Sequence, residues 1–393
     1  MSLPASRRYR PVSLAVVSVP RPRSNARHYR AAALPPDRPP PRVVLAPMEG
    51  VIDAAMRARL TSLGGYARCV TEFVRVCDLL LPERVFLRLC PELERGGRTP
   101  SGTPVYVQLL GSDPAALARN ARRAVTLGAP GIDLNFGCPA KTVNRSEGGS
   151  VLLREPARVA RIVAAVRDAV PREVPLTVKI RLGYEHGDAL AEIVAGIRAA
   201  GADELAIHAR TKRDGYRPPA RWASVAAVRA ADGGPTLING EIWSVADSVA
   251  ARRESGCGDV MLGRGALAAP DLARRILRAA ARGGAGRRES GVTPTGRTDA
   301  AGELADDDEP LLWAEVVDIV QAQFHTSDAG SPRHVGNRTK QWLAYLRRTY
   351  PGADALFARL RTLHERTAID AAFDAHRARD LAASPASAVA TVA

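Results

Sequence analysis

A cysteine in a loop with glycine and proline is the residue whose chemistry most needs explaining. Cys138 stands between Gly137 and Pro139, directly after the apolar run 131–136. Most single cysteines are small buried hydrophobic residues, but a loop of this composition favours exposure of the thiol. An exposed thiol can act as a nucleophile or as a proton donor. No histidine lies near it in the sequence to mark a protease-type nucleophile.

Three polar side chains end other apolar runs and predict an electron-rich ligand. They are Gln108, Lys179 and His208. A buried lysine needs an anion or an electron-rich partner, and lysine is so rare among the 56 basic residues that Lys179 stands out. We interpret the three side chains as donors to the ring carbonyls and N1 of a flavin. Schiff-base chemistry at Lys179 is the alternative, and a lone inward-facing histidine is more commonly a satisfied core residue.

Two glycine turns further along the chain predict a phosphate group on this ligand. One turn covers residues 239–241 and the other covers residues 263–265. Glycine lets backbone N–H groups approach phosphate oxygens, and Arg264 adds positive charge. Ordinary strand-exit turns would look the same in isolation, so the prediction depends on both turns lying at one end of the same fold.

The fold that would position these groups is a (β/α)8 TIM barrel. Stretches rich in Ala, Arg and Leu with helical character separate short apolar runs, which cover residues 43–48, 69–74, 105–110, 131–136, 176–182, 204–208, 236–239 and 259–263. Continuous apolar runs are typical of parallel strands that are buried on both faces. A doubly wound sheet is the structural alternative, but this many repeats favour the barrel. The polar residues would then gather at the carboxyl ends of the strands, where barrels build their active sites.

The barrel is predicted to be one part of a longer chain. Residues 1–42 are rich in proline and arginine and are expected to form a disordered basic tail. The other expected parts are a catalytic barrel at 43–281, a flexible linker at 282–310, a smaller all-α domain at 311–380 and a second disordered tail at 381–393. Within the helical domain, basic and aromatic residues alternate over 333–361, which suits nucleic acid. A solvated basic helix face is the plainer alternative.

The composition argues against several classes of protein. The net charge of +15 at pH 7 suggests a polyanionic partner, although the arginine-rich tail carries much of it. No apolar run approaches the roughly 18 residues that a membrane span needs. The 5 cysteines include no CxxC pair, which argues against a disulfide framework or a metal site and for a cytoplasmic protein.

Taken together, the motifs resemble those of the tRNA-dihydrouridine synthases. The segments that carry the resemblance are 46–50, 71–73, 108–111, 133–139, 179–183, 208–211, 239–241 and 263–265. The segments 73–75 and 340–347 look most like the bacterial subfamily C, whose members reduce uridine 16 in the D-loop. The resemblance extends over about residues 42–370, apart from the linker.

The resemblance implies an FMN-dependent reductase of a D-loop uridine in tRNA, with NADPH or NADH as the reductant. Hydride would pass from FMN N5 to C6 of the uracil, and Cys138 would protonate C5. FMN would be held by Pro47, Met48, Glu49, Gln108, Lys179, His208, Asn239, Gly240, Glu241, Gly263 and Arg264. The tRNA would be contacted by Arg75, Asn135, Arg181, Lys340, Trp342, Arg347 and Arg361. A monomer with no metal and no membrane contact is expected.

Two features depart from the family pattern, and three alternatives stay open. Arg145 and Glu147 stand where the family usually has glycine, so the loop of Cys138 would sit differently if those positions need positive φ. The linker is also longer than expected. The alternatives are a dihydrouridine synthase for another tRNA position, a small-molecule FMN barrel oxidoreductase, and an RNA-binding protein with an inactive barrel. The basic helical domain argues against the second, and the intact polar set argues against the third.

Overall fold

The computed structural model describes residues 39–144, 147–285, 310–327 and 335–383. Most of the expected tails and linker therefore lie outside the described residues. A long helix continues from the barrel to Ala285, past the point at which the linker was expected to begin.

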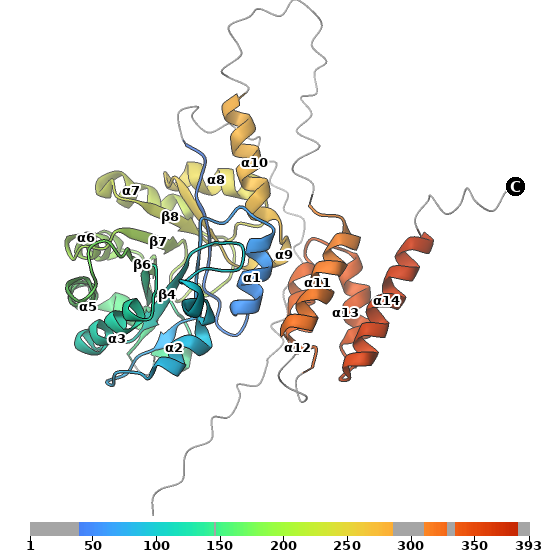
Figure 1. Ribbon diagram of the computed structural model, residues 1–393. Helices are drawn as coiled ribbons and strands as arrows, with labels where there is room; N and C mark the ends of the chain where they lie inside the picture. Colours follow the sequence, from blue (N-terminus) through green and yellow to red (C-terminus); the bar gives the residue numbers. More distant parts are fainter. Residues whose placement is uncertain (1–38, 145–146, 286–309, 328–334, 384–393) are drawn as a thin grey trace, which may run out of the picture.

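A closed barrel of parallel strands forms the larger part of the molecule (Figure 1). Its strands are β1 (Val43–Leu45), β2 (Arg68–Val70), β4 (Val105–Leu110), β5 (Ile132–Phe136), β6 (Leu176–Arg181), β7 (Glu204–His208), β8 (Thr236–Asn239) and β9 (Asp259–Leu262). The pairing of β2 with β4 and of β1 with β9 closes the circle, and β3 (Val74–Arg75) extends the edge of β4. This closure confirms the predicted barrel and excludes the doubly wound sheet.

Helices surround the barrel as the alternating sequence pattern predicts. They are α1 (Ala54–Ser62), α2 (Glu83–Leu89), α3 (Pro114–Thr126), α4 (Lys141–Asn144), α5 (Pro156–Ala169), α6 (Leu190–Ala199), α7 (Ala226–Asp232), α8 (Val245–Ser255), α9 (Arg264–Ala268) and α10 (Leu272–Ala285), with short 3-10 turns η1 (Pro91–Arg95), η2 (Gly149–Arg154) and η3 (Trp222–Val225). Capping residues in the sequence determine where α3 and α8 begin. Asp113 accepts a hydrogen bond from Ala116 N ahead of Pro114, and Ser244 and Asp247 form a capping box on α8.

The strands alternate between two different interiors. Side chains such as Leu134, Val178 and Ile207 point outward and belong to the large apolar core between strands and helices. The inward side chains include a small apolar cluster that contains Val44 and Leu237. Since side chains along a strand alternate between faces, polar residues two positions apart can form stacked layers inside the barrel.

Four further helices form the smaller domain and pack against the barrel (Figure 1). They are α11 (Trp313–Ser327), α12 (Asn337–Leu346), α13 (Gly352–Leu360) and α14 (Arg366–Ala383). The Trp342 indole donates to Leu267 O at 3.0 Å, and Arg338 donates to Gly50 O and lies 3.6 Å from the Asp53 carboxylate. These contacts fix the helical domain over the carboxyl ends of the strands.

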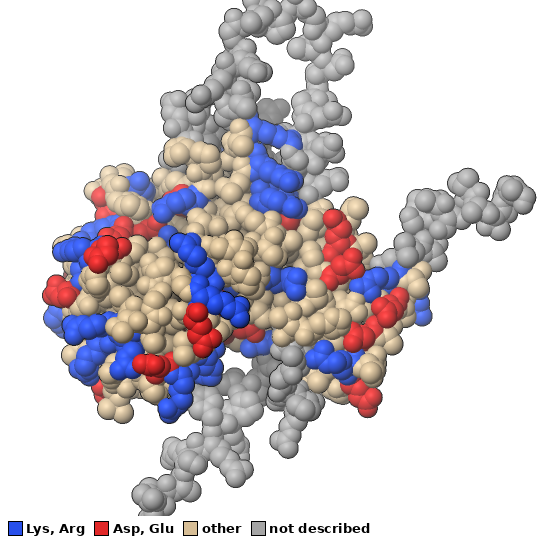
Figure 2. All heavy atoms as spheres, in the orientation of Figure 1, with Lys and Arg blue, Asp and Glu red and all other residues tan. Residues whose placement is uncertain are grey.

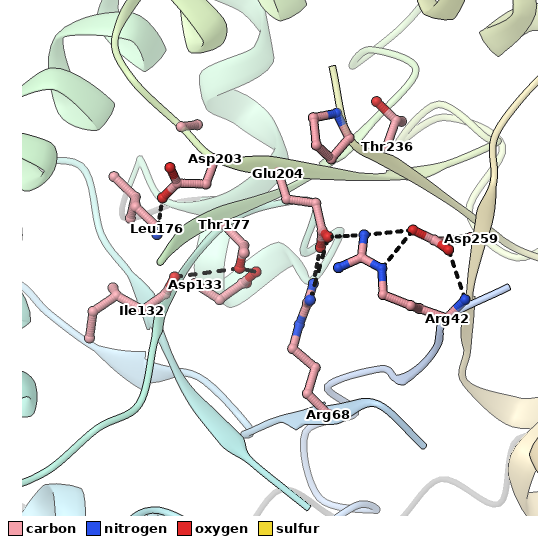
Figure 3. Close-up of polar contacts among 12 residues, drawn as sticks. Arg42, Arg68, Ile132, Asp133, Leu176, Thr177, Asp203, Glu204, Thr236 and Asp259 are labelled. Carbon is pink, nitrogen blue, oxygen red and sulfur yellow. Dashed lines mark hydrogen bonds and ion pairs between the residues drawn. The ribbon is translucent and has the colours of Figure 1, made fainter. Parts of the chain in front are cut away.

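Ion pairs close the opposite, amino-terminal end of the barrel (Figure 3). Arg42 contacts Asp259 at 2.6 Å and Glu204 at 2.7 Å, and Arg68 also pairs with Glu204. Arg42 is the last residue of the expected disordered tail. Its backbone N–H nevertheless donates to the Asp259 carboxylate at 2.7 Å, in addition to the contacts of its side chain. The ordered barrel therefore begins at or before this residue.

Candidate active site

A cavity of about 780 Å³ lies at the carboxyl ends of the strands and is lined by both domains. Every residue predicted to hold FMN lines it, and so does Cys138. The helical domain contributes Lys340 and Tyr345 from α12, Phe357 from α13 and Arg361 just beyond it. The volume lies in the range that binds cofactors and drug-sized molecules.

Lys179 places an ammonium group in this cavity, and no described carboxylate forms an ion pair with it. The residue is 9% exposed, and its side chain makes no hydrogen bond or ion pair with any described residue. Burial lowers the pKa of Lys179 to about 8, and the nearby Arg181 guanidinium adds to this effect. A buried ammonium group in this state is best satisfied by an electron-rich ligand.

His208 stands one strand away and is held neutral. Burial lowers the pKa of His208 well below its usual value, and the cations of Arg181 and Lys179 reinforce the shift. The Arg210 guanidinium lies 3.4 Å from His208 Nε2. Because a guanidinium only donates, this contact favours the tautomer that carries its proton on Nδ1.

The two glycine turns have the close contacts that glycine alone permits. Gly240 has φ +111°, and a Cβ there would lie 2.7 Å from the His208 ring. A Cβ at Gly265 would lie 2.0 Å from Ile242 O. Glu241, the residue after Gly240, adopts φ +58°. Its carboxylate accepts from Arg210 at 2.5 Å, and this contact holds the turn at 239–241 in place.

Arg264 supplies a second cation at the other side of the cavity. It begins α9, and its guanidinium lies 5.0 Å from the Tyr216 ring centroid and 5.1 Å from that of Trp243. Among the described residues no carboxylate pairs with it. Lys179 and Arg264 both line the cavity, and neither forms an ion pair with a described carboxylate. Such a pair of cations fits a ligand that has both an electron-rich ring and a phosphate. The residues present therefore fit the predicted FMN.

The loop of Cys138 is held from several directions. The Cys138 carbonyl accepts from Ser150 Oγ at 2.8 Å, and from Asn144 Nδ2 at 3.0 Å. Gly149 has φ +69°, and a Cβ there would lie 2.8 Å from the same carbonyl oxygen. Arg181 Nε donates to Gly137 O at 2.7 Å. These contacts fix the backbone around the thiol.

The environment of Cys138 favours a neutral thiol. Burial raises the pKa of the Cys138 thiol, and the Glu49 carboxylate adds to the effect, although the backbone N–H of Ala140 opposes it. Reactive thiolate nucleophiles instead have lowered pKa values. A neutral thiol of this kind suits a proton donor better than a nucleophile.

Glu147 adopts a positive φ, a backbone conformation that favours glycine. Its φ is +56°, in the left-handed region, and its carboxylate pairs with Arg158 at 2.8 Å. A non-glycine residue here costs on the order of 1 kcal/mol, yet Gly148 N still bonds to Val143 O at 3.2 Å and keeps the loop folded. Arg145 lies outside the described residues.

Of the residues predicted to contact tRNA, four line the cavity and three do not. Asn135, Arg181, Lys340 and Arg361 line the cavity. Arg75 is exposed beside the loop of Cys138 and donates to Thr142 O at 3.2 Å.

Trp342 and Arg347 do not line the cavity. Trp342 is 1% exposed and binds Leu267 O, so its position corrects the prediction of direct contact with RNA: it joins the two domains. Arg347 pairs with Asp354 and stacks over the Phe357 ring at 5.3 Å.

Two aromatic residues at the cavity were not found from the sequence. Tyr216 is 55% exposed, lines the cavity, and lies 5.3 Å from the Arg181 guanidinium. Trp243 also lines it and stacks with Arg348 of the helical domain at 3.9 Å. Their loops carry no distinctive motif, and only the path of the chain brings them to the site.

Comparison with known proteins identifies related sequences. The model of the dihydrouridine synthase (Dus) family matches residues 44–295. A tRNA-dihydrouridine(16) synthase of Shewanella oneidensis is 48% identical over 81% of this chain and 93% of its own length. Proteins of the same name from Pseudomonas putida and Vibrio cholerae are 47% and 46% identical, over 81% and 86% of this chain and 92% and 96% of their own lengths.

Two kinds of feature are absent from the described part of the chain. No helix there is long and apolar enough to cross a membrane. No group of three or more His, Cys, Asp or Glu side chains there is arranged to hold a metal ion.

Proposed function

The chain belongs to the dihydrouridine synthase family, and on that premise we propose that it reduces uridine 16 in the D-loop of tRNA to 5,6-dihydrouridine. FMN is the proposed cofactor and NADPH the proposed reductant. The observation that carries the proposal is the cavity shared by the two domains. It combines Lys179 and Arg264, which form no ion pair with any described carboxylate, with the neutral thiol of Cys138.

The residues that fit FMN occupy the barrel side of this cavity. Lys179 and Gln108 would meet its ring system, while the turns at 239–241 and 263–265 with Arg264 would hold its phosphate. When bound and reduced by NADPH, FMN would supply the hydride for C6 of the uracil ring.

Cys138 would complete the reaction by giving its thiol proton to C5 of the uracil. The raised pKa of the thiol keeps this proton in place at neutral pH. A proton from solvent then restores the thiol, so that one NADPH and one proton are consumed for each dihydrouridine. Arg181, anchored to Gly137 O, would hold the base near Cys138 together with Asn135.

The helical domain would bind the body of the tRNA. A target base must leave its stack before an enzyme can reach C5 and C6. Tyr216 offers an exposed ring in the cavity for such a base, and the exposed Arg361 stands at the cavity wall. Basic side chains also gather along α10 on the face shown in Figure 2, where phosphates would be attracted. We propose that the enzyme acts on tRNA as a cytoplasmic monomer.

Mass spectrometry of tRNA from a strain that lacks the gene tests the proposal. Dihydrouridine at position 16 should disappear and should return with the wild-type gene but not with Cys138→Ala. Loss at another D-loop position, with position 16 unchanged, would contradict the assigned position. Purified protein should carry a flavin absorption spectrum, and a colourless, flavin-free protein that still modifies tRNA would contradict FMN.

A further inference from the structure

A buried carboxylate below the cavity has no role in the reaction described so far. Asp133 on β5 is 1% exposed and does not line the cavity. A buried carboxylate is costly unless its oxygens accept hydrogen bonds. Asp133 Oδ2 accepts from the Thr177 hydroxyl at 2.6 Å (Figure 3), and Oδ1 accepts from Gln108 Nε2 at 2.6 Å. Strand register explains the contacts, because Gln108 and Thr177 are paired with Asp133 on the two neighbouring strands.

The hydrogen bonds continue from Asp133 to the loop of Cys138. Gln108 turns its amide nitrogen to the carboxylate, so its Oε1 faces away and accepts from Asn135 Nδ2 at 2.7 Å. Asn135 lies one layer above Asp133 on the same strand, in register with Lys179. Its Oδ1 accepts from Gly137 N and from Cys138 N, each at 2.9 Å.

The chemistry of the two ends determines the direction of this chain of hydrogen bonds. A carboxylate only accepts, and backbone N–H groups only donate. Gln108 must therefore present nitrogen to Asp133, and Asn135 must present oxygen to the loop, which also satisfies the contact between the two amides. If either amide were turned over, like groups would face each other at both of its ends.

We propose that Asp133 is a positioning residue, which acts through Gln108 and Asn135 to orient the backbone that holds Cys138 in the cavity. This inference rests on the proposed function, because it concerns the proton donor of that reaction. Asp133 does not line the cavity, and its hydrogen bonds reach the loop of Cys138 through the two amides.

Two substitutions separate orientation from simple burial. Asp133→Leu removes both acceptors in a side chain of similar shape. Asp133→Asn keeps an oxygen for Gln108 and can donate to the Thr177 hydroxyl oxygen, so it preserves the direction of the chain. At saturating tRNA we expect Asp133→Leu to lower the rate about 100-fold, as a small misplacement of a reacting group does, with little change in KM. Asp133→Asn should recover most of this loss.

A second measurement does not depend on catalysis. The alkylation rate of Cys138 by iodoacetamide, followed by peptide mass spectrometry with the exposed Cys77 as internal reference, reports the position of the thiol. We expect an altered rate in Asp133→Leu and a rate close to wild type in Asp133→Asn. If Asp133→Leu does not fold, Gln108→Met interrupts the same chain one step later and should alter the alkylation of Cys138.

Leu134→Ala is the matched control, because Leu134 adjoins Asp133 but points into the outer core. It should lower the thermal midpoint without changing the alkylation of Cys138 or the rate below that midpoint. Wild-type alkylation and turnover in Asp133→Leu would overturn the inference, and so would an Asp133→Asn variant as impaired as Asp133→Leu. If the wild-type enzyme did not reduce tRNA, the proposed function would fail, while the alkylation comparison would still test the orientation.

Discussion

Replacing Lys179 with methionine is expected to stabilise the flavin-free enzyme while weakening its affinity for FMN. Burial lowers the pKa of Lys179 from 10.5 to about 8. This corresponds to a cost of about 3 kcal/mol at 1.36 kcal/mol per pKa unit. Methionine fills a similar volume without charge, so at pH 7 the variant should regain at most about this free energy. For a domain of this size, the thermal midpoint would rise by about 10 °C at most.

The pH dependence of the wild-type protein provides a second measure of the same effect. The pKa of Lys179 is lower in the folded state than in the unfolded state. Between about pH 8 and pH 10.5 the unfolded chain therefore binds more protons, so the stability of the flavin-free protein rises with pH through this window. FMN affinity should fall over the same window, because the flavin would interact with the ammonium form. Lys179→Met should show neither dependence.

Calorimetry of the deflavinated protein and titration with FMN measure the two quantities. Lys179→Arg keeps the positive charge and should not raise the thermal midpoint. Lys141→Met replaces an exposed lysine and should leave both the midpoint and FMN affinity unchanged. The reasoning is refuted if flavin-free Lys179→Met unfolds at or below the wild-type temperature, or if it binds FMN as tightly as wild type at pH 7.

Three further predictions address the loop of Cys138 and the domain interface. Cys138→Ala should retain FMN and oxidise NADPH, but its single-turnover rate with tRNA should fall about 10²–10⁴-fold; an unchanged rate would remove Cys138 as the acid. In Gly149→Ala the added Cβ would lie 2.8 Å from the Cys138 carbonyl oxygen and displace it. The same rate should therefore fall while the flavin content stays constant. Trp342→Phe leaves Leu267 O without its indole donor, which should lower the unfolding free energy by about 1–3 kcal/mol in a urea titration, and full stability would mean that this contact is dispensable.

The barrel and most of its site were predictable from the sequence for one physical reason. Parallel strands buried on both faces are continuous apolar runs, so a polar residue such as Lys179 or His208 at the end of a run is conspicuous. The barrel then brings all such ends to the same side. The family assignment also favours an enzyme over a barrel that has lost activity.

The residues that escaped prediction depend on contacts distant in sequence. Tyr216 and Trp243 lie in loops, and their role at the cavity follows from the guanidinium groups of Arg181 and Arg264 beside them. In the sequence, Asp133 is distinguished only as part of the motif 133–139. A buried acid in an apolar strand says nothing about its partners, which are set by the register of β4 and β6.

The two faces of α12 separate Trp342 from Lys340, although both lie in the same basic and aromatic stretch of the sequence. In a helix, residues three, four and seven positions apart share a face. Trp342 lies three residues after Thr339 and four before Leu346, and these residues form a buried face together with Leu343. The cavity is lined by the other face, with Asn337, Lys340, Gln341, Ala344 and Tyr345. The same spacing that predicts the helix thus separates a residue that joins the domains from those available to a ligand.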